Sequence, residues 1–241
     1  MVLLLGLSVL TAEEFTTGGI YVQVASESQT CNLLSKTTNL VQQLIVGKTY
    51  HLDSDVMELK TKAGEYVTMV FSTGLQLRVA PNSTFSVDSC NQLVVNDKGQ
   101  PAVLKAEYSI TALSLMDGEL QIVCPELDTN SQCIIQTPLV NVNLAEGRLV
   151  IKSNPKYVML NAIEGSVTVV DSKNRKSIID KGQMGLIIPF PGRDAEIMVT
   201  SKVISPEELE RHIKDLDSLA LGKKDVLFAV IESKIVGVRL K

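Results

Sequence analysis

Residues 67–87, which read VTMVFSTGLQLRVAPNSTFSV, contain three short runs in which apolar and polar side chains alternate. The runs cover 67–71, 75–79 and 85–87, and they are separated by the turn-forming residues Gly74, Pro81 and Asn82. Alternate side chains of a strand point to opposite faces of a sheet. The stretch therefore predicts three half-buried strands joined by tight turns.

The same pattern continues from about residue 20 to residue 199, with Gly, Pro, Asn or Asp interrupting the apolar runs at short intervals. This spacing, with no helical periodicity between the runs, is typical of sheets built from hairpins and not of βαβ units. We therefore expect an all-β fold, a sandwich, barrel or β-roll built of hairpins, with a C-terminal helix and an apolar tail.

A short motif recurs within this region: an acidic residue, a glycine and then an alternating strand, at Asp117-Gly118, Glu146-Gly147 and Glu164-Gly165. Glycine adopts positive φ without steric cost, and the residues that follow suit a sheet. The motif predicts three turn-to-strand junctions. The unequal separations argue against a solenoid of fixed repeat.

The two ends of the chain differ from this middle. Residues 1–12 form an apolar run that is too short to span a bilayer and is typical of a secretory leader, although no basic residue precedes it; a buried first strand is the alternative. Residues 13–46 are a lead-in, whose segment 31–46 suits either a helix or strands. In residues 201–241, Ser205-Pro206-Glu207-Glu208 predicts the start of a helix that reaches about Leu219. The segment 226–240 favours a strand or docking tail over a helix.

Composition excludes several functions. The net charge is −4, from 23 basic and 27 acidic residues, so the chain lacks the positive field that gathers nucleic acid. Trp is absent and aromatic residues make up 4% of the chain, which leaves little surface on which bases or sugars could stack. We expect no nucleic-acid partner.

The residues that carry catalysis or bind metals are also scarce. The two histidines, His51 and His212, are expected on the surface. Asp53, Asp55 and Glu58 could contribute to a calcium site, but solvated turn charges explain them more simply. We therefore expect no catalytic site, no metal site and no cofactor, and hence a protein that is not an enzyme.

Four cysteines are compatible with an oxidising compartment. Cys124 and Cys133 flank a turn-rich loop, and we predict that they form a disulfide across a hairpin. Cys31 and Cys90 would form a second disulfide by elimination, but two buried thiols are an equally ordinary explanation.

A series of motifs follows in order along residues 47–188: 47–56, 63–71, 73–87, 117–120, 135–138, 164–167 and 180–183. Among them, Ile135-Gln136-Thr137-Pro138 is similar to an I-x-T-P segment, and Asp180-Lys181-Gly182-Gln183 is similar to a closing x-x-G-Q turn. In this order they resemble the FecR-type periplasmic sensor domain. The R-G-T that the family places after the Thr-Pro is here Asn143-Leu144-Ala145-Glu146-Gly147.

The resemblance implies a FecR-like β domain over residues 47–200, an antiparallel folded-over β-roll or sandwich. It also implies that this domain is exported to the periplasm or cell surface and works by contacting other proteins. We therefore expect a non-catalytic protein-binding or scaffolding module whose partner is an envelope protein or a second copy, with no transmembrane span in the mature chain. Two alternatives stay open: a carrier that holds a lipid or another amphipathic ligand in the β-roll, and a structural subunit of a surface assembly.

Overall fold

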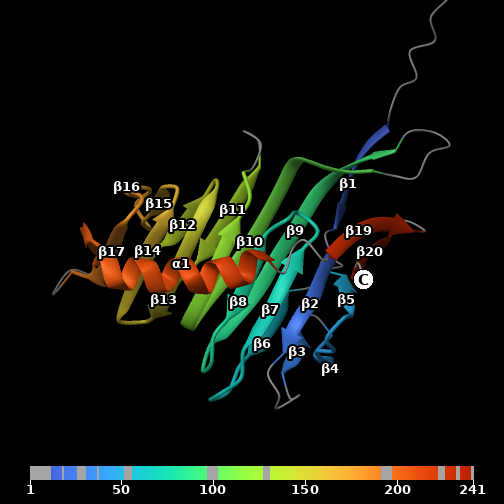
Figure 1. The fold of residues 1–241 in the computed structure, drawn as a ribbon, viewed down its shortest axis with the longest axis horizontal. Helices are drawn as coiled ribbons and strands as arrows, with labels where there is room; N and C mark the ends of the chain where they lie inside the picture. The colour runs from blue at the N-terminus through green and yellow to red at the C-terminus, as the bar shows by residue number, and fades with distance from the viewer. Residues whose placement is uncertain are drawn as a thin grey trace, which may run out of the picture.

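The computed structural model describes residues 12–17, 19–25, 31–36, 38–51, 56–96, 103–126, 131–190, 197–221, 226–231 and 234–239. Over these residues the chain forms twenty strands and one helix. Eighteen of the strands, β1 to β18, build two sheets that face each other, and Figure 1 shows the helix α1 lying across one of them. No helix in this part of the chain is both long enough and apolar enough to span a membrane.

The first sheet, sheet A, has its strands paired in the order β4 (Val41–Gln43), β3 (Asn32–Ser35), β6 (Met57–Lys60), β9 (Thr84–Asn96), β10 (Val103–Cys124), β11 (Gln132–Gln136), β12 (Asn141–Leu144), β15 (Val167–Val170) and β16 (Lys176–Ile179). The strand β1 (Ala12–Thr17) pairs with the second half of β9.

The second sheet, sheet B, has the order β5 (Thr49–His51), β2 (Gly19–Ala25), β7 (Val67–Phe71), β8 (Gln76–Val79), β10, β13 (Gly147–Asn154), β14 (Tyr157–Glu164), β17 (Gln183–Pro189) and β18 (Ile197–Val203). Sheet A and sheet B therefore share one strand, β10.

The strand β10 passes from one sheet to the other at Gly118. Residues up to Asp117 pair with β9 in sheet A, whereas residues from Gly118 onward pair with β13 in sheet B. Gly118 has φ +104°, and a Cβ at this position would lie 2.5 Å from the Cα of Ser83. Only glycine meets both demands, so this residue sets the point where the two sheets fold over each other.

The core lies between the inner faces of the two sheets. Its largest fully buried side chains come from both sheets: Leu59, Met69, Phe71, Leu77, Phe85, Leu113, Leu115, Leu120, Ile122, Ile135 and Leu144. Each such side chain contributes about 1.5–3 kcal/mol relative to an exposed position. The predicted alternation is confirmed for β8 and β9, whose Leu77, Val79, Phe85 and Val87 belong to this core. It is wrong for β7, in which all five residues are buried.

Two of the three acidic-glycine motifs are confirmed as turn-to-strand junctions, with Gly147 at φ +118° and Gly165 at φ +72°. Gly118, at φ +104°, lies instead inside β10, where the strand passes between the sheets. Gly147 and Gly165 lie against each other where β13 begins and β14 ends. A Cβ on Gly165 would collide with the carbonyl oxygen of Glu146, and a Cβ on Gly147 with that of Glu164. The repeated motif thus marks a close approach of two backbones as well as a turn.

The sheets are antiparallel as predicted, apart from one pair. The strand β11 runs parallel to the sheet A half of β10, with Cys133 beside Thr111. The cause is the fold in β10: its second half ends in sheet B at the open end of the sandwich, and the chain then re-enters sheet A there. A strand that starts at this end must run in the same direction as the first half of β10.

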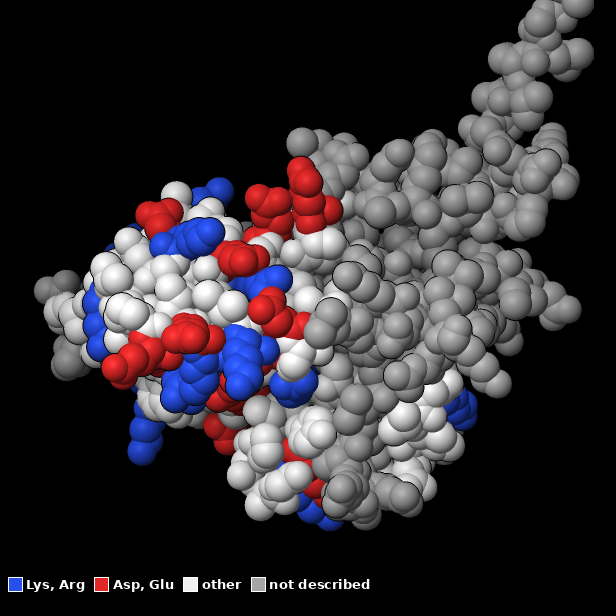
Figure 2. All heavy atoms as spheres, in the orientation of Figure 1, with Lys and Arg blue, Asp and Glu red and all other residues white. Residues whose placement is uncertain are grey.

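The helix α1 (Pro206–Leu221) packs on the outer face of sheet B. The hydroxyl of Ser205 accepts a hydrogen bond from the backbone N–H of Glu208 at 3.3 Å, so the predicted N-cap is confirmed. Leu216 and Leu219 are buried against Val150 and Ile163 of the sheet. On this face, basic and acidic side chains are interspersed (Figure 2), in keeping with the near balance of charges in the sequence.

The segments outside the predicted β domain also join the fold. The lead-in supplies β1 to β4, so the segment 31–46 forms strands and not a helix. The tail forms a hairpin of β19 (Val226–Ile231) and β20 (Lys234–Arg239), whose strands contact β2, β5 and β10 of the same chain (Figure 1). The predicted leader lies outside the described residues except for Ala12, which begins β1.

Candidate interaction surface

Five strands lie at the edges of the sheets: β1, β4 and β16 in sheet A, and β5 and β18 in sheet B. The strand β4 differs from the others in its exposure. All three residues of β4 are exposed, and among the described strands β4 pairs only with β3. A free edge and exposed side chains make β4 accessible to another chain.

Four large apolar side chains are exposed on and beside this strand: Leu40 (67% exposed), Val41 (64%), Ile45 (54%) and Val46 (51%). We call these four residues the edge patch. Single exposed apolar residues are common on protein surfaces, but four within residues 40–46 indicate an interaction site. The edge patch is therefore the strongest candidate site in the described part of the chain.

The edge patch is held in place by buried neighbours. The hydroxyl of Tyr50 donates to the carbonyl oxygen of Gln43 at 3.0 Å and accepts from the N–H of Ile45 at 2.8 Å. Tyr50 and Leu44 are both buried, so they anchor the segment that carries the exposed residues. Burial raises the pKa of Tyr50, and its hydrogen bond from Ile45 acts in the opposite direction.

These hydrogen bonds also close part of the open edge. The outward-facing carbonyl of Gln43 and N–H of Ile45 already have Tyr50 as a partner, so a new strand could not use them. Native sheets commonly protect their edges against uncontrolled pairing in such ways. Side-chain contacts with the edge patch are therefore better supported than extension of the sheet.

Lysines border the edge patch. Lys36 lies in the same hairpin, and Lys48 lies in the turn after Val46 with its Nζ 5.3 Å from the centre of the Tyr50 ring. Lys36 also pairs with Glu58 at 3.1 Å, and Lys60 pairs with the same carboxylate at 2.9 Å. The hydrogen bond from Lys60 is the main cause that lowers the pKa of Glu58. The surroundings of the edge patch therefore favour acidic groups on a partner.

Glu58 is the only member of the suggested calcium cluster whose surroundings the structure describes, since residues 52–55 lie outside the described ranges. Its two oxygens contact Lys36 and Lys60. Within the described residues, no group of three or more His, Cys, Asp or Glu side chains could hold a metal ion.

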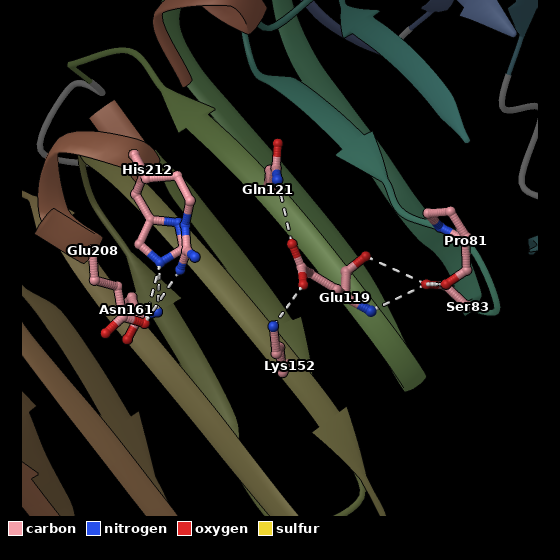
Figure 3. A network of polar contacts seen from close by, with 9 residues as sticks. Pro81, Ser83, Glu119, Gln121, Lys152, Asn161, Glu208 and His212 are labelled. Carbon is pink, nitrogen blue, oxygen red and sulfur yellow. Dashed lines mark hydrogen bonds and ion pairs between the residues drawn. The ribbon is translucent and has the colours of Figure 1, made fainter. Parts of the chain in front are cut away.

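A second polar cluster lies where α1 meets sheet B (Figure 3). The amide nitrogen Nδ2 of Asn161 in β14 is 3.0 Å from Nε2 of His212, and Oε1 of Glu208 is 3.7 Å from the same ring nitrogen. Next to it, Oε2 of Glu119 in β10 pairs with Nζ of Lys152 in β13 at 3.1 Å. The contact of Asn161 with His212 joins the helix to β14, and the pair of Glu119 and Lys152 joins β10 to β13.

The expectation that His212 is a surface residue is wrong, because its side chain is only 6% exposed. The charged neighbours of His212 in the sequence suggested an exposed position. At helical spacing, however, residues 209, 212, 216 and 219 share the face of α1 that packs on sheet B. Burial and the nearby Arg211 lower the pKa of His212, whereas Glu208 and Glu119 act to raise it. The side chain of His51 lies outside what the structure describes.

Two of the hollows in the described surface are of modest volume. A groove of about 430 Å³ lies beside α1 and is lined by Tyr66, Arg78, Pro81 and Glu119, among others. A hollow of about 330 Å³ lies between the ends of the two sheets, lined by residues that include Asp171, Arg175 and Val199. Both contain charged side chains, whereas a site for an acyl chain would be apolar.

The four cysteines are buried thiols in this structure. Cys31 lies beside β3, and β6 separates β3 from β9, which contains Cys90. Along the strand register the two residues are roughly 20 Å apart, at about 3.3 Å per residue and 4.8 Å between strands. A disulfide requires Cα atoms within about 7 Å, so the fold does not support the predicted Cys31–Cys90 pair.

Cys124 and Cys133 are in contact, but not across a hairpin as expected. Cys124 ends β10 in sheet B opposite Gly147, whereas Cys133 lies in sheet A beside Thr111 and Leu144. The two residues therefore meet between the sheets. Their disulfide stays a prediction.

Comparisons with known proteins add little. No family model matches the chain, and no curated protein matches its sequence. Two crystal structures, each described as that of "a putative anti-sigma factor from Parabacteroides distasonis", resemble it at TM-scores of 0.45 and 0.43 and identities of 10% and 11%. They cover 77% and 76% of this chain and 100% and 99% of their own. Likenesses this distant say nothing about function, and the FecR resemblance stays a prediction.

Proposed function

We propose that the chain is a non-catalytic protein-binding module of the cell envelope, which contacts its partner through the edge patch of sheet A. The observation that carries this proposal is the group of four exposed apolar side chains on and beside one open edge strand. Apolar surface left in water is unfavourable, by about 25 cal/mol per Å² relative to buried surface. Covering these side chains with a partner recovers this free energy.

The partner is a protein segment with apolar side chains flanked by acidic ones. The apolar side chains would cover Val41 and Ile45, and the acidic ones would lie near Lys36 and Lys48. Opposite charges at the rim of an interface speed association and select the partner more than they add affinity. Binding should therefore weaken moderately as the salt concentration rises.

The location in the envelope is supported by the leader-like residues 1–12 of the sequence. The absence of catalysis is supported by the surroundings of His212. This histidine lies beneath α1, and its contacts with Asn161 and Glu208 are those of a polar group that joins a helix to a sheet.

The proposal can be tested with short random peptides displayed on phage and selected against the purified full-length chain. We expect the selected peptides to contain apolar residues, in a cluster or alternating with polar residues, flanked by Asp and Glu. Val41→Asp should weaken the selected peptides by at least about tenfold, which corresponds to about 1.4 kcal/mol. The substitution buries no new group in the free protein, because Val41 is exposed.

Ile178→Asp is the matched control. Ile178 lies in β16, the opposite edge strand of the same sheet, and its exposed fraction of 63% is nearly that of Val41. This variant introduces the same charge at an equivalent kind of position and should bind the peptides as the wild type does. Equal binding by both variants and the wild type would refute the edge patch as the docking site.

A carrier of lipid would behave differently. It would retain an acyl chain between the sheets after gentle purification, and the edge variants would retain it too. The facing sides of the sheets are filled by buried side chains such as Phe71, Phe85 and Leu120, which leaves the carrier alternative without a specific supporting observation.

A further inference from the structure

Three buried thiols gather at the end of the sandwich opposite the fold at Gly118. Thr111 in the middle of sheet A has Cys90 as its partner in β9 and Cys133 as its partner in β11. Residues opposite each other in neighbouring strands point to the same face. Cys90 and Cys133 are accordingly both core residues, 1% and 2% exposed.

Cys124 reaches the same place from the other sheet. Because β10 folds over between Asp117 and Gly118, residues at equal distances from the fold face each other across the core. Thr111 lies six residues before Asp117 and Cys124 six residues after Gly118, so Cys124 is placed opposite Thr111.

The turn between β12 and β13 supports this placement. Leu144, which pairs with Cys133 in sheet A, and Gly147, which pairs with Cys124 in sheet B, are three residues apart. The carbonyl oxygen of Ala145, between them, is 3.9 Å from the Sγ of Cys124. The thiols of Cys124 and Cys133 also share a hydrogen bond, which together with burial raises the pKa of Cys133 well above its usual value.

The fold restricts which of these thiols can be joined. Cys90 and Cys133 lie on either side of β10, so their Cα atoms are about 9.6 Å apart at 4.8 Å per strand spacing, beyond the reach of a disulfide. Cys124 and Cys133 lie on facing sheets, an arrangement that disulfides bridge in other sandwiches. We propose that Cys124 and Cys133 form a disulfide that ties sheet A to sheet B, while Cys90 stays a thiol beside it.

The chemistry is a two-electron oxidation. One cysteine, as a thiolate, attacks the disulfide of a thiol–disulfide oxidoreductase and forms a mixed disulfide, and the second cysteine then displaces the oxidoreductase. The two thiols lose two protons and two electrons, and the oxidoreductase becomes a dithiol. Burial raises the pKa of Cys90 to about 11, and the Cys124 thiol together with burial raises the pKa of Cys133. The thiolate is therefore disfavoured in the folded protein, so the exchange belongs to folding, before the core closes.

This inference rests on the proposed envelope location only because the location supplies the thiol–disulfide oxidoreductase. Whether the bond forms can be tested on the purified chain. The full-length chain is reduced, unfolded and refolded in a buffer of reduced and oxidised glutathione, and remaining thiols are then alkylated. Peptide mapping without reduction should show one linked pair, Cys124 with Cys133, and full alkylation of Cys31 and Cys90. Alkylation of all four cysteines, or any other linked pair, would overturn the inference.

Stability provides a second readout. The oxidised chain should melt roughly 5–10 °C above the reduced chain, because the bond closes a short loop in the unfolded state. Cys90→Ala should keep this difference, and Cys133→Ala should abolish it. A Cys133→Ala variant that keeps the difference would contradict the proposed pair.

Protein isolated from the native envelope with its thiols trapped separates the two proposals. A bond that forms in glutathione but is missing from this sample would count against the envelope location and leave the pairing intact. A bond that forms in neither sample would count against the pairing. This outcome would not depend on the result of the peptide selection, which tests the edge patch.

Discussion

Replacement of Gly118 by alanine should destabilise the protein by more than its backbone conformation alone explains. Two effects add at this position. Its φ of +104° is unfavourable for a residue with a Cβ, at a cost of about 1–3 kcal/mol. The new Cβ would also lie 2.5 Å from the Cα of Ser83, and a backbone atom cannot turn away as a flexible side chain can. Overpacking of this kind costs about a further 1–3 kcal/mol.

Gly64→Ala is the matched control for the steric part. Gly64 also has a positive φ, +78°, but nothing lies within 4 Å of the Cβ that alanine would add. This variant should therefore lose only the backbone term, about 1–2 kcal/mol. The difference between the two variants isolates the contact with Ser83.

The assay is equilibrium unfolding in urea, with thermal unfolding as a check. We expect Gly118→Ala to lose about 4 kcal/mol and its melting temperature to fall by roughly 8–16 °C, at about 2–4 °C per kcal/mol for a chain of this size. If Gly118→Ala and Gly64→Ala lose the same stability, the close approach of β10 to Ser83 is not what fixes the fold between the sheets.

Three further predictions concern the helix and the edge patch. Because burial lowers the pKa of His212, this histidine binds a proton more readily in the unfolded protein than in the folded protein. The stability of the wild type should therefore fall as the pH drops below about 6.5. Urea unfolding between about pH 7.5 and 5.5 should show a weaker fall in stability for His212→Gln. Leu216→Ala should cost about 2–4 kcal/mol because Leu216 is fully buried beneath α1, whereas Ile213→Ala, at a 36% exposed position of the same helix, should cost much less; equal losses in thermal unfolding would contradict the helix packing. Tyr50→Phe should cost about 1–3 kcal/mol and speed amide exchange at Ile45, because this N–H loses its hydroxyl partner; unchanged exchange would show that the hydroxyl does not hold the edge patch.

Local features of the fold were predictable because neighbouring residues determine them. The alternation in 67–87 depends on the period of a strand, and Ser205 with Pro206 is a local signal for a helix start. The glycines at 118, 147 and 165 were identified by the acidic residue before each and the strand after it.

Features that depend on long-range pairing could not be predicted. The strand β10 contains 22 residues and belongs to both sheets, and nothing near Asp117-Gly118 distinguishes a fold between sheets from an ordinary hairpin turn. The hairpin assigned to Cys124 and Cys133 failed for this reason, since Cys133 pairs with strands that are distant in the sequence.

The candidate site was missed at first because apolar residues are usually buried. Leu40, Val41 and Ile45 belong to the segment 31–46, which suits either a helix or strands, and nothing in this segment distinguishes its exposed apolar residues from its buried ones. His212 is the opposite case, because its charged neighbours in the sequence predicted exposure and the residue is buried. Both cases require knowledge of which faces the other elements cover.

The central claim is that the edge patch binds another protein. Its most direct test is native mass spectrometry, with lipid extraction alongside, of the wild type and of the Val41→Asp and Ile178→Asp variants, each purified gently from its own envelope. We predict that the wild type and Ile178→Asp carry the same protein partner in a defined ratio, that Val41→Asp has lost it, and that none carries lipid. A partner that stays bound to Val41→Asp, or a monomer that carries one lipid per chain, would contradict the claim.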